Sequence, residues 1–123
     1  MEYYSDASYN NQMGIGVIGF MGPDLNVITQ MVNVHGSTGC EVEAFNRMLD
    51  YAKSNDHSDI IAYTDCNKVV KMGSEIDYDD LHVSVIKVKG HSKMSDKSPQ
   101  DLLFKTVDKA VRKTLRDAVR FYK

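Results

Sequence analysis

The sequence predicts an α/β fold in which helices flank a five-stranded mixed sheet, with three antiparallel strands continued by two parallel strands. Three observations lead to this prediction. The first 35 residues contain three strand-like segments joined by short turns, which is typical of an antiparallel meander. The hydrophobic period then changes to that of a helix. Finally, residues 59–64 form a nearly uninterrupted apolar run, as in a strand buried on both faces.

The three antiparallel strands are expected at 2–8, 12–21 and 26–35. Asparagines follow the first segment and the sequence Gly-Pro-Asp follows the second, and these residues favour tight turns. Because such short connections join neighbouring strands, the three segments should pair in the order in which they occur.

A helix is expected at about 39–54, because apolar residues recur there every three or four positions. The buried strand at 59–64 follows this helix, and a short helical stretch at 66–72 follows the strand. Strands that alternate with helices pair in parallel, so this half of the chain should extend the sheet with parallel strands. The expected inward stripe of the first helix consists of Val42, Phe45, Met48, Leu49 and Ala52.

The last part of the chain is expected to contain one more strand and a long helix. Residues 82–89 alternate apolar and polar side chains, as a half-buried strand does. Ser98, Pro99 and Asp101 then supply an N-cap, a proline at the first helical position and an acidic first turn. The helix should run to the end of the chain with an inward stripe of Leu103, Val107, Val111, Leu115 and Ala118.

Length and composition limit the class of protein. We expect residues 1–123 to form one domain, and 42% hydrophobic with 26% charged residues is usual for a soluble globular protein. No apolar run reaches the roughly 18 residues of a membrane span, and the N-terminus has no signal-peptide pattern. The two cysteines are too few for a disulfide framework. We therefore expect an intracellular protein, in the cytoplasm or nucleus, that does not enter a membrane.

The net charge of −2 is unevenly distributed. Residues 105–123 contain seven Lys or Arg and two Asp, so they carry +5 while the rest of the chain carries −7. A basic helix beside an acidic body could hold a phosphate backbone near a cation-binding carboxylate cluster. The alternative is that these side chains only solvate the outer face of the last helix. The basic face consists of Lys105, Lys109, Arg112, Lys113 and Arg116, and we take Lys109, Lys113 and Arg116 as the candidate phosphate contacts.

Four acidic residues lie where this fold could bring them together. Asp6 lies inside a strand that should be central, and Asp65 follows the carboxyl end of the buried strand. In open α/β sheets, ligands bind at that edge. On the first helix, Glu41 falls on the apolar side whereas Glu43 falls opposite and is expected to face water. Asp108 lies at the border of the apolar stripe of the last helix.

Each of these residues also has a purely structural explanation. Asp65 could be the N-cap of the short helix that follows it. Glu41 ends the sequence Thr-Gly-Cys-Glu, which matches a capping box. Asp108 could form an ion pair with Arg112 one turn later. Together, however, carboxylates without His or Cys partners favour Mg²⁺ or Mn²⁺, and four of them could hold two ions roughly 4 Å apart for phosphodiester cleavage.

Five segments of the sequence resemble the type I ribonucleases H, and the resemblance covers nearly the whole chain. YYSDAS followed by GIGVIGF is similar to the first two strands of that family, and EVEAFNRML is similar to the start of its first helix. YTDCNKVV is similar to its Tyr-Thr-Asp-Ser-x-x-Val segment, and VKGHS to its Val-Lys-Gly-His segment. VDKAVRK is similar to the closing Asp-x-x-Ala-Arg segment, with the alanine one position early.

The resemblance implies a ribonuclease H-like fold and an endonuclease that cuts the RNA strand of an RNA/DNA hybrid, leaving 5′-phosphate and 3′-hydroxyl ends. It also implies two Mg²⁺ ions, for which Mn²⁺ can substitute, and a histidine, His91, that assists proton movement or product release. Ser8, Glu41 and Asn67 would contact the RNA 2′-hydroxyl groups. The metal ligands implied by the resemblance are Asp6, Glu41, Asp65 and Asp108.

The chain departs from the family pattern at three points. His91 and Asp108 are 17 residues apart, which is longer than usual. The basic helical protrusion of some members is missing, and Ser-Thr-Gly-Cys replaces the usual Asn-rich stretch before the glutamate. These departures point to low substrate affinity, or to dependence on a protein partner or a larger polyprotein. The protein itself is expected to be a monomer.

Three related functions stay open on the sequence alone. A catalytically weak or inactive nucleic-acid-binding module of the same fold would not need all four carboxylates. A Holliday-junction resolvase would share the carboxylates, but it normally dimerises and would not contain YTDCNKVV. A 3′–5′ exonuclease would have Asp-x-Glu in the first strand, where this chain has Asp6-Ala7-Ser8.

Overall fold

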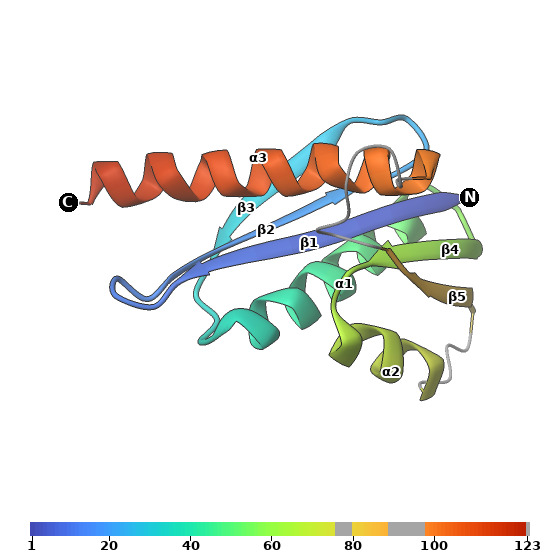
Figure 1. The fold of residues 1–123 in the computed structure, drawn as a ribbon. Coiled ribbons are helices and arrows are strands. Elements are labelled where there is room, and N and C mark those ends of the chain that lie inside the picture. Colours follow the sequence, from blue (N-terminus) through green and yellow to red (C-terminus); the bar gives the residue numbers. More distant parts are fainter. Residues whose placement is uncertain (76–79, 89–97, 123) are drawn as a thin grey trace.

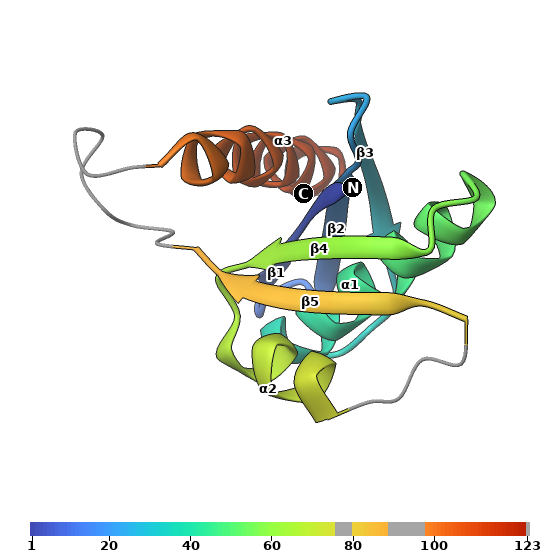
Figure 2. The ribbon, with the colours of Figure 1, turned by 90° about the vertical axis from the view of Figure 1, so that its right-hand side faces the viewer.

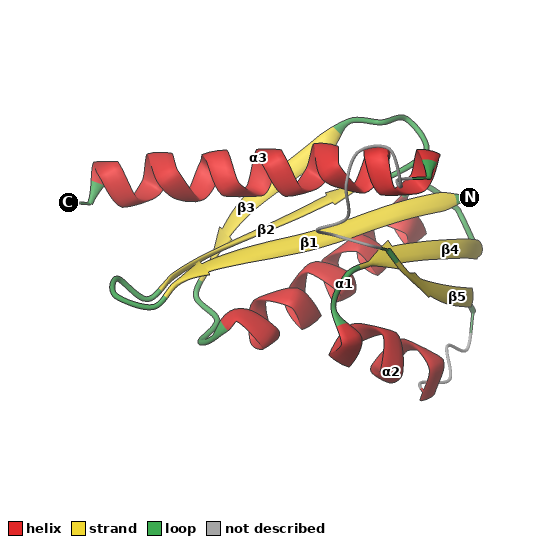
Figure 3. Cartoon of the chain, in the orientation of Figure 1, coloured by secondary structure: helices red, strands yellow, loops and turns green. Residues whose placement is uncertain are grey.

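The structure is a computed structural model that describes residues 1–75, 80–88 and 98–122. Strands and helices follow one another in the predicted order (Figures 1 and 3). In chain order they are β1 (Glu2–Asn10), β2 (Ile15–Met21), β3 (Val27–Val32), α1 (Ser37–Ser54), β4 (Asp59–Thr64), α2 (Asn67–Glu75), β5 (His82–Lys87) and α3 (Pro99–Phe121).

The five strands form one mixed sheet in the order β3-β2-β1-β4-β5. β1 pairs antiparallel with β2, and β2 pairs antiparallel with β3. β4 pairs parallel with β1 on one side and with β5 on the other. The predicted fold class, three antiparallel strands continued by two parallel strands, is therefore confirmed.

Helices cover both faces of this sheet. Figure 2 shows α3 on one side and α1 with α2 on the other. The core beneath α1 and α2 includes the fully buried Phe45 and Met48, and the core beneath α3 includes Val107 and Val111. α3 packs closely because β2 has a glycine below it: a Cβ at Gly19 would overlap Val111 Cγ2 and lie 3.2 Å from Val107 Cγ1.

Side-chain alternation along β1 determines which face each of its residues serves. Tyr3 and Ala7 belong to the core on the α1 side, whereas Tyr4 belongs to the core beneath α3. Asp6 lies two positions after Tyr4 and so shares the face of the sheet that α3 covers.

The ends of several elements differ from the prediction. β2 begins at Ile15 rather than at 12, and β3 ends at Val32 rather than at 35. Leu103 and Leu115 of the expected inward stripe of α3 are only partly buried, while Phe104, which was not expected there, is buried. The predicted start of α3 is correct: Ser98 and Asp101 form a reciprocal capping box with proline in the first turn.

The start of α1 corrects one interpretation. The helix begins at Ser37, its N-cap is Gly36 with a φ of 86°, and no side chain in the described part of the structure caps it. The Thr-Gly-Cys-Glu sequence therefore does not form a capping box. The N-cap position is instead occupied by Gly36, whose positive φ ends the preceding loop and is readily adopted by glycine. Glu41 is left free for another role.

Among the described helices, none has the length and apolar character that crossing a lipid bilayer requires.

Candidate active site

Three carboxylates meet at the carboxyl edge of the parallel strands. Asp6, Glu41 and Asp65 each offer an oxygen, and these oxygens all lie within 4.8 Å of one another. The strand register explains part of this meeting. Tyr4 of β1 lies opposite Tyr63 of β4, so the positions two residues further along each strand reach the same level. Asp65 comes directly after the end of β4, where the chain turns toward α2.

Glu41 reaches this edge from α1 because the backbone of β1 gives it an anchor. β4 ends at Thr64, whereas β1 continues to Asn10, so among the described residues the second half of β1 has no parallel partner on that side. The amide of Ala7 instead donates a hydrogen bond of 3.1 Å to Glu41 Oε1. This bond fixes the Glu41 carboxylate beside the central strand.

A second backbone contact shapes the turn that carries Asp65. The buried Thr64 hydroxyl accepts a hydrogen bond of 3.2 Å from the amide of Cys66. Thr64 and the Ala7 amide were both missed in the sequence. The Thr64 hydroxyl could have been suspected from its place at a strand end, but no side-chain pattern marks a backbone amide.

Burial raises the pKa of two of these carboxylates, Asp6 and Glu41. Burial, followed by the charge of Glu41 and the proximity of the Asp108 carboxyl, raises the pKa of Asp6 well above its ordinary value. Burial also raises the pKa of Glu41, and the charge of Asp65 adds to this effect, while the neighbouring Asp6 carboxyl and the hydrogen bond from the Ala7 amide oppose it. The carboxylates therefore resist being charged together unless a cation compensates them.

The residues present fit a divalent cation. Asp6 Oδ2 and Glu41 Oε2 are both buried, and within the described part of the chain neither has a hydrogen-bond partner. Buried polar atoms in proteins are nearly always partnered, so two such oxygens side by side call for a ligand. The donors are carboxylate oxygens, which Mg²⁺ and Mn²⁺ prefer.

Asp108 lies beside the group of three and has two interactions. Its Oδ1 is 3.1 Å from Arg112 Nε, and its carboxyl is close enough to Asp6 to help raise the pKa of Asp6. The ion pair with Arg112, one of the two alternatives that the sequence left open, is therefore present, and Asp108 is not one of the three carboxylates whose oxygens lie within 4.8 Å of one another. The side chain of Asp108 is 21% exposed, whereas that of Arg112 is 57% exposed.

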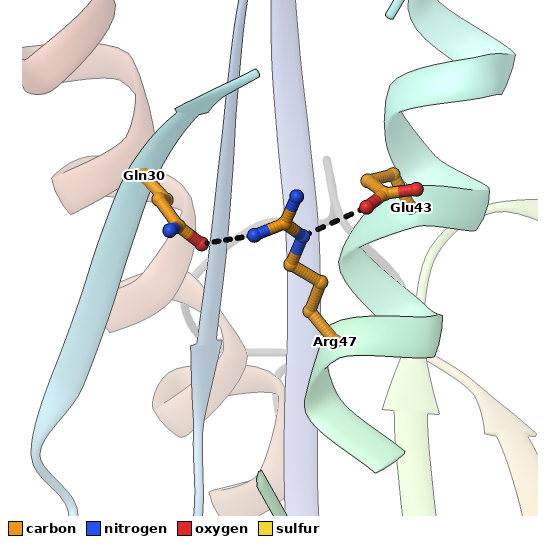
Figure 4. Close-up of polar contacts among 3 residues, drawn as sticks. All are labelled: Gln30, Glu43 and Arg47. Atoms are coloured by element: carbon orange, nitrogen blue, oxygen red, sulfur yellow. Dashed lines mark hydrogen bonds and ion pairs between the residues drawn. The ribbon is translucent and has the colours of Figure 1, made fainter. Parts of the chain in front are cut away.

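Glu43 points away from the carboxylates, as the helical phase predicts, but it is half-buried rather than fully in water. Its Oε1 accepts a hydrogen bond of 2.7 Å from Arg47 Nε, and Arg47 Nη1 donates one of 2.9 Å to Gln30 of β3 (Figure 4). Glu43 thus helps to fasten α1 to the edge strand.

The other predicted site residues are spread around the carboxylates or along α3. Ser8 is half-buried on β1, two positions after Asp6, and Asn67 is the exposed first residue of α2. Exposed positions on α3 are occupied by Lys109, Lys113 and Arg116. His91 lies outside the described residues.

Comparison of the sequence with protein-family models and with curated proteins gives no match. Solved structures do match. RNase H1 from the halophilic archaeon Halobacterium salinarum is 14% identical with a TM-score of 0.61, over 86% of this chain and 92% of that one.

Two further solved structures also match this chain. The N-terminal RNase H domain of a Mycobacterium tuberculosis protein is 14% identical with a TM-score of 0.60, over 95% of this chain and 98% of that one. LC11-RNase H1 in complex with an RNA/DNA hybrid is 14% identical with a TM-score of 0.55, over 89% of this chain and 98% of that one.

The chain is thus an α/β protein with the ribonuclease H fold and an acidic cluster at the carboxyl edge of its sheet. More narrowly, all three neighbours are RNase H domains and two are RNase H1 proteins, so the resemblance to type I ribonucleases H is confirmed at the level of the fold.

Proposed function

We propose that this protein is a metal-dependent endoribonuclease that hydrolyses the RNA strand of RNA/DNA hybrids. The observation that carries the proposal is the arrangement of Asp6, Glu41 and Asp65, whose oxygens lie within 4.8 Å of one another. Two of the carboxylate oxygens there are buried without a partner in the described structure. Carboxylates placed this close together repel one another, and a cluster with only a structural role would gain nothing from that repulsion.

The four carboxylates divide into two overlapping sets of metal ligands. Asp6, Glu41 and Asp65 would hold one Mg²⁺, and Asp6 with Asp108 would hold a second. Bound in this way, the ions would supply Lewis acidity for activating water and for stabilising the leaving 3′-oxygen. Mn²⁺ is expected to substitute, because it accepts the same oxygen ligands.

The protein's own groups orient the reaction. The Ala7 amide holds Glu41 Oε1, so Oε2 is the oxygen left for a ligand. Ser8 and Asn67 flank the carboxylates and are proposed to contact the RNA 2′-hydroxyl groups, which distinguish RNA from DNA. Products would carry 5′-phosphate and 3′-hydroxyl ends.

The basic face of α3 is proposed to hold the phosphate backbone. Lys109, Lys113 and Arg116 are exposed on the helix that also carries Asp108. One structural neighbour is an RNase H1 in complex with an RNA/DNA hybrid, which supports the choice of substrate.

A cleavage assay tests the proposal. A hybrid labelled on its RNA strand is incubated with the protein in Mg²⁺ or in EDTA, alongside an RNA duplex, a DNA duplex and a four-way DNA junction of matched sequence. We expect Mg²⁺-dependent cleavage of the hybrid at internal sites. Binding without cleavage would instead identify an inactive nucleic-acid-binding module, and cleavage of the junction alone would identify a resolvase.

A further inference from the structure

The ion pair between Arg112 and Asp108 lies between solvent and the carboxylate cluster. Arg112 Nε is 3.1 Å from Asp108 Oδ1, and the two residues are one helical turn apart on α3. Asp108 also lies close enough to the buried Asp6 to help raise the pKa of that carboxyl. Asp108 is therefore a neighbour of both an exposed guanidinium and the most buried member of the cluster.

Asp108, which is paired with Arg112, is not part of the group of carboxylates that lie close enough together to hold a cation. Three carboxylates offer oxygens within 4.8 Å of one another, and Asp108 is not among them although it belongs to the described residues. The guanidinium neutralises the carboxylate and adds a positive charge close to the site. Both effects oppose the binding of a divalent cation by Asp108.

Arg112 is also placed to meet a polyanion. More than half of its side chain is exposed, and Lys109, Lys113 and Arg116 are exposed on the same helix. Guanidinium binds phosphate through two parallel hydrogen bonds, and this geometry competes well with a single Nε contact to a carboxylate.

We propose that Arg112 is a positioning residue that exchanges Asp108 for a phosphate of the bound nucleic acid, so that nucleic-acid binding frees Asp108 to bind metal. This inference rests on the proposed function, since it takes the nucleic acid as substrate. Thermodynamic linkage requires the effect to be mutual: nucleic acid strengthens metal binding, and metal strengthens nucleic-acid binding by the same factor.

The first test measures Mn²⁺ binding to the protein without nucleic acid, by electron paramagnetic resonance of the free ion. If Arg112 competes with the metal, R112Q binds Mn²⁺ more tightly than wild type, by about fivefold or more. If Arg112 merely holds Asp108 in place, R112Q binds Mn²⁺ equally or more weakly, and the proposal is overturned.

Two comparisons separate this effect from a general loss of positive charge. R120Q removes an exposed arginine from the last turn of the same helix and should change Mn²⁺ affinity little. In a D108N background, the R112Q substitution should lose most of its effect, because the carboxylate for which arginine and metal compete is absent. An equal gain in both backgrounds would contradict the exchange.

The second test repeats the titration with a hybrid whose RNA strand carries 2′-O-methyl groups and is not cleaved. Wild type should bind Mn²⁺ more tightly when the hybrid is present, and R112Q should show little of this gain. Equal gains in the two proteins, or no gain in wild type, would overturn the proposal. Because neither titration requires turnover, failure of the exchange is distinguishable from failure of the proposed ribonuclease activity.

Discussion

The Glu41 carboxylate accepts a hydrogen bond of 3.1 Å from the amide of Ala7, one residue after Asp6 on the central strand. This bond joins the first helix to the strand at the point where β4 has ended. It also separates the two oxygens of Glu41 by role: Oε1 is structural, and Oε2 is buried with no partner in the described structure. If Glu41 only capped its helix, we would expect neither the hydrogen bond from Ala7 nor the buried oxygen without a partner.

Glu41→Gln should therefore be far more damaging to activity than Glu43→Gln. The amide oxygen of glutamine can still accept from Ala7, so the fold should persist, while a metal ligand is lost. We expect single-turnover cleavage to fall about 100-fold or more for Glu41→Gln, equivalent to a few kcal/mol. Glu43→Gln loses the ion pair with Arg47 and should cost only about 0–1 kcal/mol of stability. Comparable losses of activity would show that the helix has been assigned the wrong functional face.

The metal-free protein should become less stable as the pH rises. The pKa values of Asp6 and Glu41 are raised in the folded state, so the folded protein retains protons that the unfolded chain releases above about pH 4. Stability then falls from about pH 4 up to the raised values, because charging the cluster favours unfolding. Urea unfolding in EDTA at pH 5 and pH 8 measures this, and Asp6→Asn should show a smaller loss. Identical losses in the two proteins would contradict the electrostatic account.

The basic face of α3 should contribute binding rather than chemistry. Replacing Lys109, Lys113 and Arg116 together by glutamine should weaken hybrid binding and flatten its dependence on salt, because fewer counterions are released. Single-turnover cleavage at saturating protein should change little. The control is Lys53→Gln, on α1, where Lys53 Nζ lies 3.6 Å from Asp80. An unchanged binding constant and salt slope in the triple variant would mean that the basic side chains only solvate the helix.

Gly19→Ala should destabilise the fold by about 1–3 kcal/mol, because the added methyl group overlaps Val111 of α3. Shortening the opposing side chain should relieve the overlap, so Gly19→Ala should cost less in a Val111→Ala background. Urea unfolding of the four proteins gives the coupling energy. Strictly additive effects would show that α3 does not pack against Gly19 as described.

The fold could be predicted from the sequence because each element has its own hydrophobic period. The alternation in β1 and the unbroken apolar run of β4 specify a sheet, and the stripe of α1 specifies a helix against it. The ends of elements could not be predicted as well. The start of α1 depends on a loop that brings Gly36 into a left-handed conformation, and a side-chain pattern suggested a capping box instead.

The candidate site was predictable only as a set of residue types. The sequence places Asp6 inside β1 and Asp65 directly after β4, and parallel pairing of these two strands brings the two residues to the same level. It contains no signal for the Ala7 amide that holds Glu41, because a backbone donor exists at every residue and only the early end of β4 leaves this one available. The position of Asp108 near Asp6 likewise depends on how closely α3 approaches the sheet.

Cleavage of an RNA/DNA hybrid by Asp65→Asn protein is the most direct test of the proposed metal site. We expect cleavage in Mg²⁺ to be lost, while hybrid binding persists and the metal-free melting temperature holds or rises, because one source of repulsion has been removed. Asp50→Asn, at an exposed position of α1, is the matched control and should cleave like wild type. Asp65→Asn protein that cleaves the hybrid at the wild-type rate would contradict the assignment of the site.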